Sequence, residues 1–314
     1  MARFRQIYLE ITNVCNLRCA FCPGTTRPPQ RMTPAQFAAL LSQVKPLTFQ
    51  IYLHVLGEPL LHPDFARLIE LAGEAGVPVA VTTNGTLLGT PAADSLLCPG
   101  VRQVNISLHS LYGRTVGDEQ RRRLAEILAF TRRAGERRPD LYLNYRLWNF
   151  ASAEYSDETE LNVWLSREIA SGLNLPVPAV TAAVGCKTRR LCGRLYLDLD
   201  TRFEWPERIP GAPENECGTC HGMIDQLAIL ADGTVVPCCL DRNGVIALGN
   251  ALTTPLTVIL DSPRARAMAD GLRAGKLVEP LCRQCTFRTR FKFKGAPVSG
   301  AGPVPPRNSE GDIP

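Results

Sequence analysis

The sequence lacks the features of a membrane or secreted protein. Nowhere in its 314 residues do 18 consecutive apolar residues occur, so no membrane-spanning helix is expected. No apolar leader precedes the first strand-like segment, which argues against a signal peptide. Charge of one sign is also scarce, because 35 basic and 30 acidic residues leave a net charge of only +5. So small an excess does not indicate nucleic-acid binding, and the composition, with 45% hydrophobic and 21% charged residues, is that of an ordinary globular protein.

Cysteine, in contrast, is abundant, with 12 residues. Without a secretory signal, this content favours metal binding in a reducing compartment over disulfides, and we expect a cytoplasmic protein. Cys15, Cys19 and Cys22 directly follow the apolar run 7–12. Three thiolates at this spacing can hold an iron-sulfur cluster and leave one iron open to a reactant. The spacing alone fits a structural zinc site equally well. The position after a strand favours a reactive site, because barrel enzymes carry their chemistry at the C-terminal ends of strands.

With Phe21 as its aromatic residue, this C-x-x-x-C-x-aromatic-C loop resembles the signature of the radical S-adenosylmethionine (SAM) enzymes. The resemblance implies that Cys15, Cys19 and Cys22 hold a [4Fe-4S] cluster and that the methionine end of SAM chelates the fourth iron. It also implies that backbone near Phe21 meets the adenine. In such enzymes one electron cleaves SAM to a 5'-deoxyadenosyl radical, which abstracts a substrate hydrogen. An electron donor such as a flavodoxin or ferredoxin is therefore an expected partner.

The N-terminal two thirds of the chain alternates β-rich runs with amphipathic segments, which is the pattern of a parallel sheet built from strand-helix units. Thr33 is the expected N-cap of the first helix, and Gly76 the C-cap signal of the second. Expected strands are 5–12, 48–54, 77–82, 101–108 and 141–147, and expected helices are 34–44, 63–76, 118–134 and 157–171. Since polar residues follow each strand, we predict an α/β fold, a partial (β/α)6 radical SAM barrel with its active site on one rim.

Gly57, Glu58 and Pro59 follow the second expected strand. Read alone, they are a turn with a solvated glutamate. The family resemblance implies instead that this Gly-Glu-Pro stretch contacts the SAM amino group. Backbone carbonyls and a carboxylate suit an ammonium, which has donors only.

The next two strands end in further polar residues. Thr83 and Asn84 close the third strand, where Asn-Gly is also an ordinary turn signal, and the resemblance places them near the cofactor. Asn105 and Ser107 alternate with apolar residues and so share one face of the fourth strand. The resemblance implies that Ser107 contacts the SAM ribose or carboxylate.

His109 and Arg146 each allow two interpretations. His109 could act as a substrate-site acid or base, or be a hydrogen-bonded rim residue. Arg146 could hold the SAM carboxylate through two parallel hydrogen bonds, or be a surface arginine.

The C-terminal part holds a second concentration of thiols. Segments 226–230 and 234–238 read as a hairpin with an Asp-Gly turn, which brings Cys220 and Cys238 together. Cys282 and Cys285 form a C-x-x-C pair that can clasp one metal or one cluster edge. Two pairs make four ligands, and their spacing fits a zinc ribbon as well as a cluster.

The order of a cysteine, a hairpin ending in Pro-Cys, a helix and C-x-x-C resembles the SPASM/twitch extension of radical SAM enzymes. It implies an auxiliary [4Fe-4S] cluster, and the absence of cysteine after Cys285 favours the one-cluster twitch form. A fully ligated cluster would carry electrons. Cys217 competes with Cys220 as a ligand, and Cys239 competes with Cys238, to which Pro237 directs the family match. Cys186 and Cys192 could ligate metal but are expected to be free. The predicted ligands are Cys220, Cys238, Cys282 and Cys285.

We therefore predict a radical SAM barrel over 1–200, a small twitch/SPASM-like β-hairpin plus helix domain over 201–294, and a disordered tail over 295–314. Alternating aromatic and basic residues over 287–294 predict an edge strand, with a nucleic-acid contact as the alternative. The predicted function is net oxidation or maturation of a small molecule or peptide. The alternative is a non-catalytic metal or iron-sulfur scaffold that binds RNA or protein.

Overall fold

The computed structural model describes residues 4–111, 116–148, 156–177, 180, 188–200 and 203–291. These residues form one ten-stranded sheet in the order β10-β9-β8-β1-β2-β3-β4-β5-β7-β6. Its strands are β1 (Gln6–Leu9), β2 (Ile51–Tyr52), β3 (Val79–Thr83), β4 (Val101–Ser107), β5 (Tyr142–Trp148), β6 (Thr188–Cys192), β7 (Leu195–Asp200), β8 (Gln226–Ile229), β9 (Thr234–Val236) and β10 (Gly249–Asn250). The longer helices are α1 (Pro34–Val44), α2 (Phe65–Glu74), α3 (Asp118–Arg137), α4 (Ser156–Gly172) and α7 (Pro263–Arg273), and the short ones α6 (Leu256–Leu260) and α8 (Pro280–Gln284).

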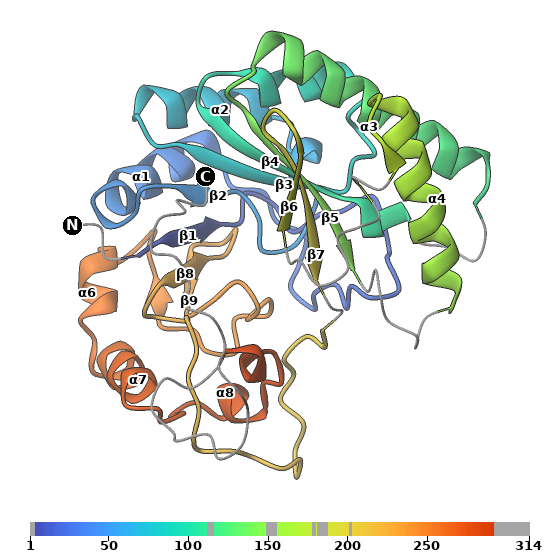
Figure 1. The fold of residues 1–314 in the computed structure, drawn as a ribbon. Helices are drawn as coiled ribbons and strands as arrows, with labels where there is room; N and C mark the ends of the chain where they lie inside the picture. Colours follow the sequence, from blue (N-terminus) through green and yellow to red (C-terminus); the bar gives the residue numbers. More distant parts are fainter. Residues whose placement is uncertain are drawn as a thin grey trace.

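The predicted partial barrel is confirmed. Strands β1 to β5 and then β7 pair with one another in parallel, and the curved sheet that they form carries helices α1, α2 and α3 on its outer side (Figure 1). The connection between β3 and β4 differs from a regular unit, because it holds the 3-10 helix η3 (Pro91–Leu97) and no α-helix. Strand β6 adds an antiparallel edge next to β7.

Helix α1 begins as the sequence predicts. The Thr33 hydroxyl accepts a hydrogen bond from the Gln36 backbone, and the Gln36 side chain accepts one from the Thr33 backbone. This capping box satisfies backbone donors at the helix start. The apolar side of the helix packs onto the sheet through Phe37, Leu40 and Val44, each fully buried.

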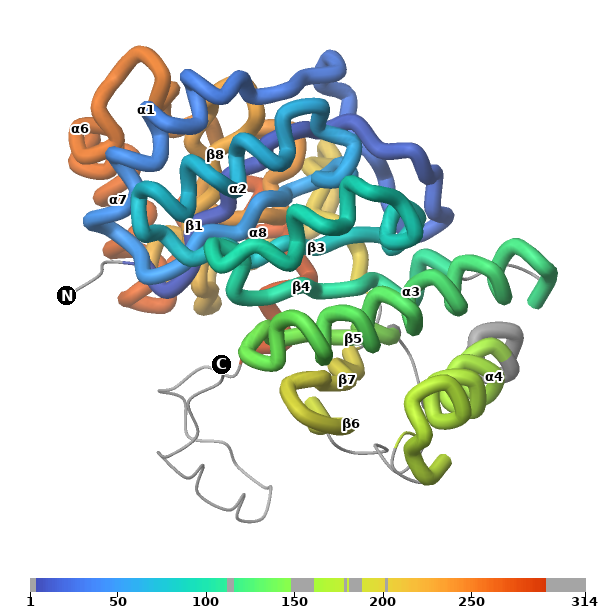
Figure 2. Tube along the Cα trace, turned by 90° about the horizontal axis from the view of Figure 1, so that it is seen from above, coloured from blue at the N-terminus to red at the C-terminus, as the bar shows by residue number. Residues whose placement is uncertain are grey.

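The C-terminal hairpin continues the barrel sheet. Strand β8 pairs in parallel with β1, with Gln6 opposite Gln226 and Leu9 opposite Ile229, while β9 returns antiparallel. Gly233 supplies the positive φ of +89° that the hairpin turn needs. Viewed from above (Figure 2), α6 and α7 lie at the β1 end of the sheet, and α3 and α4 at the β5 end. One hydrophobic core runs through both parts, so the predicted boundary near residue 200 stays a prediction.

The predicted edge strand over 287–294 is wrong for its first residues, because Phe287–Arg290 is a 3-10 helix, η5. Phe287 and Phe291, one turn apart, have ring centroids separated by 5.7 Å, and Phe287 also packs on Phe203 at 4.9 Å. Ring packing at helical spacing therefore outweighs the alternating pattern. The predicted tail and Cys186 lie outside the described residues. Within the part that the structure describes, no helix is long and apolar enough to cross a membrane.

Candidate active site

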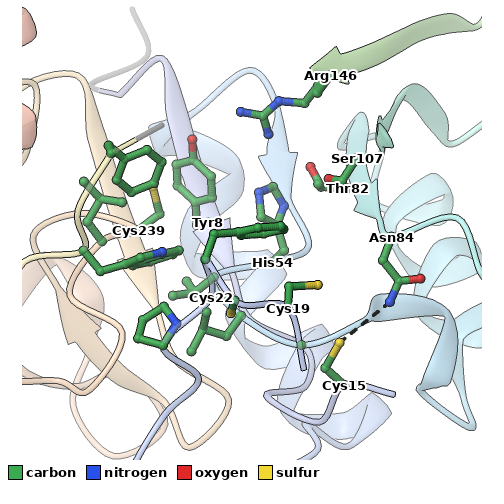
Figure 3. Close-up of a pocket in the computed structure, with 18 of the residues that line it drawn as sticks. Tyr8, Cys15, Cys19, Cys22, His54, Thr82, Asn84, Ser107, Arg146 and Cys239 are labelled. Atoms are coloured by element: carbon green, nitrogen blue, oxygen red, sulfur yellow. Dashed lines mark hydrogen bonds between the residues drawn. The ribbon is translucent and has the colours of Figure 1, made fainter. Parts of the chain in front are cut away.

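A cavity of about 870 Å³ opens between the barrel strands and the C-terminal part. Figure 3 shows Cys15, Cys19 and Cys22 on one side of it, Asn84, Thr82, Ser107 and Arg146 on another, and Cys239 opposite them. The predicted site residues that line it are Cys15, Cys19, Phe21, Cys22, Gly57, Thr83, Asn84, Ser107, His109 and Arg146. Glu58, Pro59 and Asn105 do not line it.

The three N-terminal thiols lie close enough to affect one another. Burial, followed by the nearby Cys15 and Cys22, raises the pKa of Cys19 to about 11. The Asn84 side-chain amide donates a hydrogen bond of 3.7 Å to the Cys15 sulfur. A bound cation would compensate the charge of thiolates gathered in this way, and thiolates are the usual ligands of iron-sulfur clusters, so the donor set fits such a cluster.

Gly57 and Glu58 shape the loop after β2. Gly57 has a φ of +80°, and a Cβ there would overlap the Thr12 carbonyl oxygen, so only glycine fits. The buried Glu58 carboxyl accepts hydrogen bonds from the Thr83 hydroxyl at 2.8 Å and from the Asn84 backbone at 2.7 Å. Burial raises the pKa of Glu58 to about 7 despite these donors. The carboxyl thus holds Asn84 in place instead of pointing into the cavity.

Ser107 and Arg146 come from neighbouring strands. They stand opposite one another in the β4–β5 register, and both line the cavity. The Arg146 guanidinium makes no hydrogen bond or ion pair with any described residue, so it remains available to an anionic group. Asn105 lies further down β4 and is buried in a polar ladder with Thr82 and Asn144.

His109 is held rather than exposed. Its Nδ1 lies 3.1 Å from the Arg146 carbonyl oxygen, and its ring meets the Phe21 ring edge to face at 5.2 Å. Burial, together with the Arg146 charge, lowers the pKa of His109 to about 3. The imidazole is therefore neutral at neutral pH, which favours the hydrogen-bonded interpretation, and a role as acid or base stays a prediction.

The second thiol group lies behind the cavity wall. Burial raises the pKa of all four predicted ligands, Cys220, Cys238, Cys282 and Cys285. In addition to burial, the nearby thiolates of Cys220 and Cys285 raise the pKa of Cys282, and those of Cys220 and Cys282 raise the pKa of Cys238. The four predicted ligands thus gather in one place. Cys217, the competing candidate, is exposed.

Three residues that line the cavity were not among the predicted site residues. Tyr8 and His54 face the barrel interior, where their rings pack edge to face at 5.4 Å. Cys239 lines the cavity and packs, like Tyr8, against a small apolar cluster. The adjacent residues Cys238 and Cys239 lie in the turn that follows β9, and of the two only Cys239 lines the cavity.

Comparison with known families bears on these two thiol groups. A model of the radical SAM superfamily matches residues 9–145, and a model of an iron-sulfur cluster-binding domain, SPASM, matches residues 220–286. The chain thus contains a radical SAM domain. Its C-terminal part is a SPASM domain, and the cofactors that these domains imply are SAM, a [4Fe-4S] cluster and further iron-sulfur binding.

Spacing alone leaves zinc and clusters open for both thiol groups, and the matched domains decide between them. Radical SAM and SPASM domains imply iron-sulfur clusters, and a cubane cluster takes its thiolates on separate irons. Among the described residues, no group of three His, Cys, Asp or Glu side chains is placed to hold a single metal ion.

Relatives with assigned activities are varied. GTP 3',8-cyclase of Microcystis aeruginosa is 27% identical over 296 residues, covering 78% of this chain and 84% of the relative. AdoMet-dependent heme synthase of Methanosarcina barkeri is 30% identical over 114 residues, and this match spans only 35% of this chain and 33% of the relative.

Solved structures with the same fold cover most of the chain. BtrN in complex with AdoMet and 2-DOIA has a TM-score of 0.56 at 16% identity, over 91% of this chain and 94% of BtrN. Streptococcus suis SuiB bound to precursor peptide SuiA has a TM-score of 0.57 at 16% identity, over 90% of this chain and 71% of SuiB.

Proposed function

We propose that the protein is a radical SAM oxidoreductase or maturase that catalyses a net two-electron oxidation of a small molecule or peptide. The observation that carries this proposal is that one cavity reaches from the N-terminal thiols to Cys239, the neighbour of Cys238 in the second thiol group. A substrate in this cavity would lie between a source of radicals and a destination for an electron.

The N-terminal half of the site would hold the cofactor. Cys15, Cys19 and Cys22 are the proposed ligands of the SAM-binding cluster, and Phe21 the proposed neighbour of the adenine. When bound, the reduced cluster and SAM supply a 5'-deoxyadenosyl radical that abstracts a substrate hydrogen. Arg146 would pair with the SAM carboxylate in a bidentate manner.

Gly57 and Glu58 would serve SAM in different ways. The Gly57 backbone lines the cavity and offers a carbonyl to the SAM ammonium. Glu58 would act indirectly, through the hydrogen bonds that fix Thr83 and Asn84. Ser107, opposite Arg146, is the proposed contact to the ribose or carboxylate.

The second thiol group would receive the substrate electron. Cys220, Cys238, Cys282 and Cys285 are its proposed ligands, because all four are at least partly buried and near one another. With four ligands, an auxiliary cluster has no open iron, so electron transfer is its proposed task. An external donor such as a flavodoxin or ferredoxin would reduce the SAM-binding cluster.

The test is formation of 5'-deoxyadenosine from SAM by the iron-replete enzyme under anaerobic, reducing conditions. Replacing Cys15, Cys19 and Cys22 together by alanine should abolish the product while retaining the iron of the second group. Retained SAM cleavage in this variant would overturn the ligand assignment. No product from iron-replete wild type would favour the non-catalytic scaffold.

Substrate class is tested by the source of the abstracted hydrogen. The fold neighbours include one structure in complex with 2-DOIA and one bound to a precursor peptide. Small molecules and peptides therefore both stay in the proposal as substrate classes. With deuterated cell extract split by size, deuterium in 5'-deoxyadenosine should come from the fraction that holds the substrate. Transfer from the small-molecule fraction would identify a metabolite, and transfer from the macromolecular fraction a peptide or protein.

A further inference from the structure

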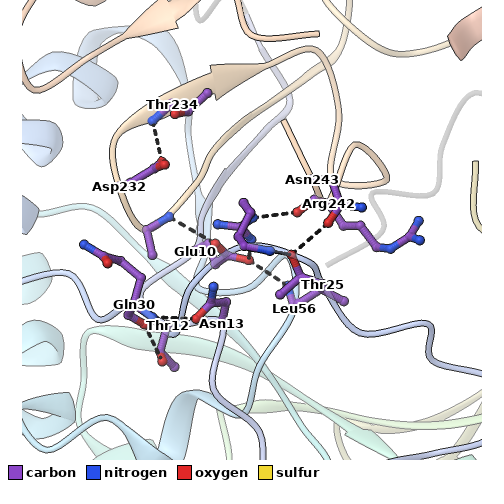
Figure 4. Close-up of polar contacts among 12 residues, drawn as sticks. Glu10, Thr12, Asn13, Thr25, Gln30, Leu56, Asp232, Thr234, Arg242 and Asn243 are labelled. Atoms are coloured by element: carbon purple, nitrogen blue, oxygen red, sulfur yellow. Dashed lines mark hydrogen bonds and ion pairs between the residues drawn. The ribbon is translucent and has the colours of Figure 1, made fainter. Parts of the chain in front are cut away.

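Glu10 follows β1 and has a fully buried carboxylate with partners on three other segments. Its Oε1 accepts hydrogen bonds from Arg27 Nη2 at 2.7 Å and from the Leu56 backbone at 3.2 Å. Its Oε2 accepts one from the Ala231 backbone at 3.0 Å. The carboxylate thus joins the loop that carries the N-terminal thiols, the loop that leads into Gly57, and the turn of the β8–β9 hairpin (Figure 4).

Further hydrogen bonds join the loop that carries Arg27 to residues 242–243, which follow the Cys238-Cys239 pair. Arg27 Nε donates to the Arg242 carbonyl at 2.8 Å, and Arg242 Nε donates to the Gly24 carbonyl at 2.9 Å. The Thr25 hydroxyl donates to the Asn243 side chain at 2.8 Å. Residues 24–27, just after Cys22, are therefore bonded to residues 242–243, just after the Cys238-Cys239 pair.

Burial makes this connection sensitive to loss of charge. A carboxylate in the protein interior is stable only when it is paired and hydrogen-bonded. Arg27, whose side chain is 12% exposed, is the one cation within ion-pair distance of Glu10 among the described residues. This buried ion pair therefore acts, together with the hydrogen bonds to residues 242–243, to hold the thiol loop against the hairpin.

We propose that Glu10 is a positioning residue that sets the placement of the SAM-binding cluster relative to the auxiliary cluster. This inference rests on the ligands assigned under the proposed function. Partners outside the ligand shell orient metal ligands, and their loss typically costs about 10- to 100-fold in affinity or activity. Among the described residues, Glu10 accepts hydrogen bonds from Arg27, Leu56 and Ala231 and from no thiol, so its effect passes through the segments that it joins.

The first test is Glu10→Gln in the full-length enzyme with both clusters reconstituted. The amide keeps the shape of the side chain but removes the charge that Arg27 neutralises. Iron content should stay at the wild-type value, while the SAM concentration needed to change the EPR signal of the reduced N-terminal cluster should rise about tenfold. Glu74→Gln removes an exposed ion pair with Arg67 and should leave both quantities unchanged.

Arg27 variants separate positioning from simple loss of stability. Arg27→Lys keeps the charge and should rescue most of the SAM response that Arg27→Gln loses. The double variant Glu10→Gln with Arg27→Gln should be no worse than the worse single variant, because the two residues act as a unit. These Arg27 variants also carry the test if Glu10→Gln does not fold. A lower melting temperature with an unchanged SAM-dependent EPR response would overturn the proposal.

A readout on iron-free protein keeps this inference separate from the proposed function. Alkylation of Cys19 should be several-fold faster in Glu10→Gln than in wild type, because the loop opens more often. Alkylation of Cys282 should be unchanged. If wild type fails to cleave SAM, the proposed function falls while this comparison still decides whether Glu10 holds the loop. Equal Cys19 rates in the two proteins would refute the role of Glu10.

Discussion

The Glu58 carboxyl is only 1% exposed and accepts hydrogen bonds from two cavity residues, Thr83 and Asn84. Its position within the Gly-Glu-Pro stretch was predictable from the sequence, but its direction was not. A turn residue can point outward or inward, and only the tertiary structure shows the three donors that Thr83, Asn84 and Leu60 offer on the inner side.

Glu58 should also make the stability of the fold depend on pH. Burial raises its pKa from 4.5 to about 7, so the folded state binds the proton more tightly than the unfolded state. Its contribution is therefore fully present below pH 4.5 and is lost as pH rises toward 7. A shift of this size corresponds to about 3 kcal/mol.

Urea unfolding at several pH values tests this expectation. The free energy of unfolding of wild type relative to Glu58→Gln should fall by up to about 3 kcal/mol between pH 4.5 and 7.5. The exposed Glu74→Gln should keep a constant difference from wild type over the same range. A constant difference for Glu58→Gln as well would show that the carboxyl titrates alike in both states.

At the scale of elements, the predicted hairpin is confirmed, but its place in the sheet was not predicted. The Asp-Gly turn at Gly233 and the flanking apolar residues predict local pairing, because the signal lies within a dozen residues. Pairing of β8 with β1 joins segments that are far apart in the chain, and no local pattern encodes such a contact. The predicted edge strand is wrong at Phe287–Arg290 for the opposite reason. The sequence has an alternating pattern there, but packing between aromatic rings favours a 3-10 helix.

The hairpin and the C-x-x-C pair allow a direct choice between the competing ligands. Cys220 packs against the core and is close to Cys285. Cys217, in contrast, is exposed, and its backbone forms an isolated β-bridge with Lys276. Cys220→Ser should therefore lose the iron of the second group, while Cys217→Ser should keep it. Both substitutions are made in the variant in which Cys15, Cys19 and Cys22 are replaced by alanine. Its iron and sulfide content then reports on the second thiol group alone. Iron loss on Cys217→Ser alone would reverse the assignment.

At the scale of the whole molecule, the C-terminal part completes the barrel core. Met223, Leu227, Ile229 and Val235 are at most 1% exposed and belong to the same core as Ile7. Burying each such side chain stabilises a fold by about 1.5–3 kcal/mol, so these four together match about the net stability of a typical domain.

A fragment that ends at residue 202 should therefore fail to fold on its own. We expect it to aggregate, or to show no cooperative thermal transition by circular dichroism. Removal of residues 295–314 alone is the matched control and should leave the transition of the full chain in place. A monomeric fragment that melts like the full chain would show that the barrel does not need its C-terminal strand.

Because β1 is paired with β8 on one side, the order of synthesis matters. Gln6 leaves the ribosome 220 residues before its partner Gln226. At about 5–20 residues per second, one edge of β1 stays unpaired for roughly 10–45 s. An open strand edge invites pairing with other chains, so the nascent protein passes through a period in which chaperones, rather than its own sheet, must protect its first strand.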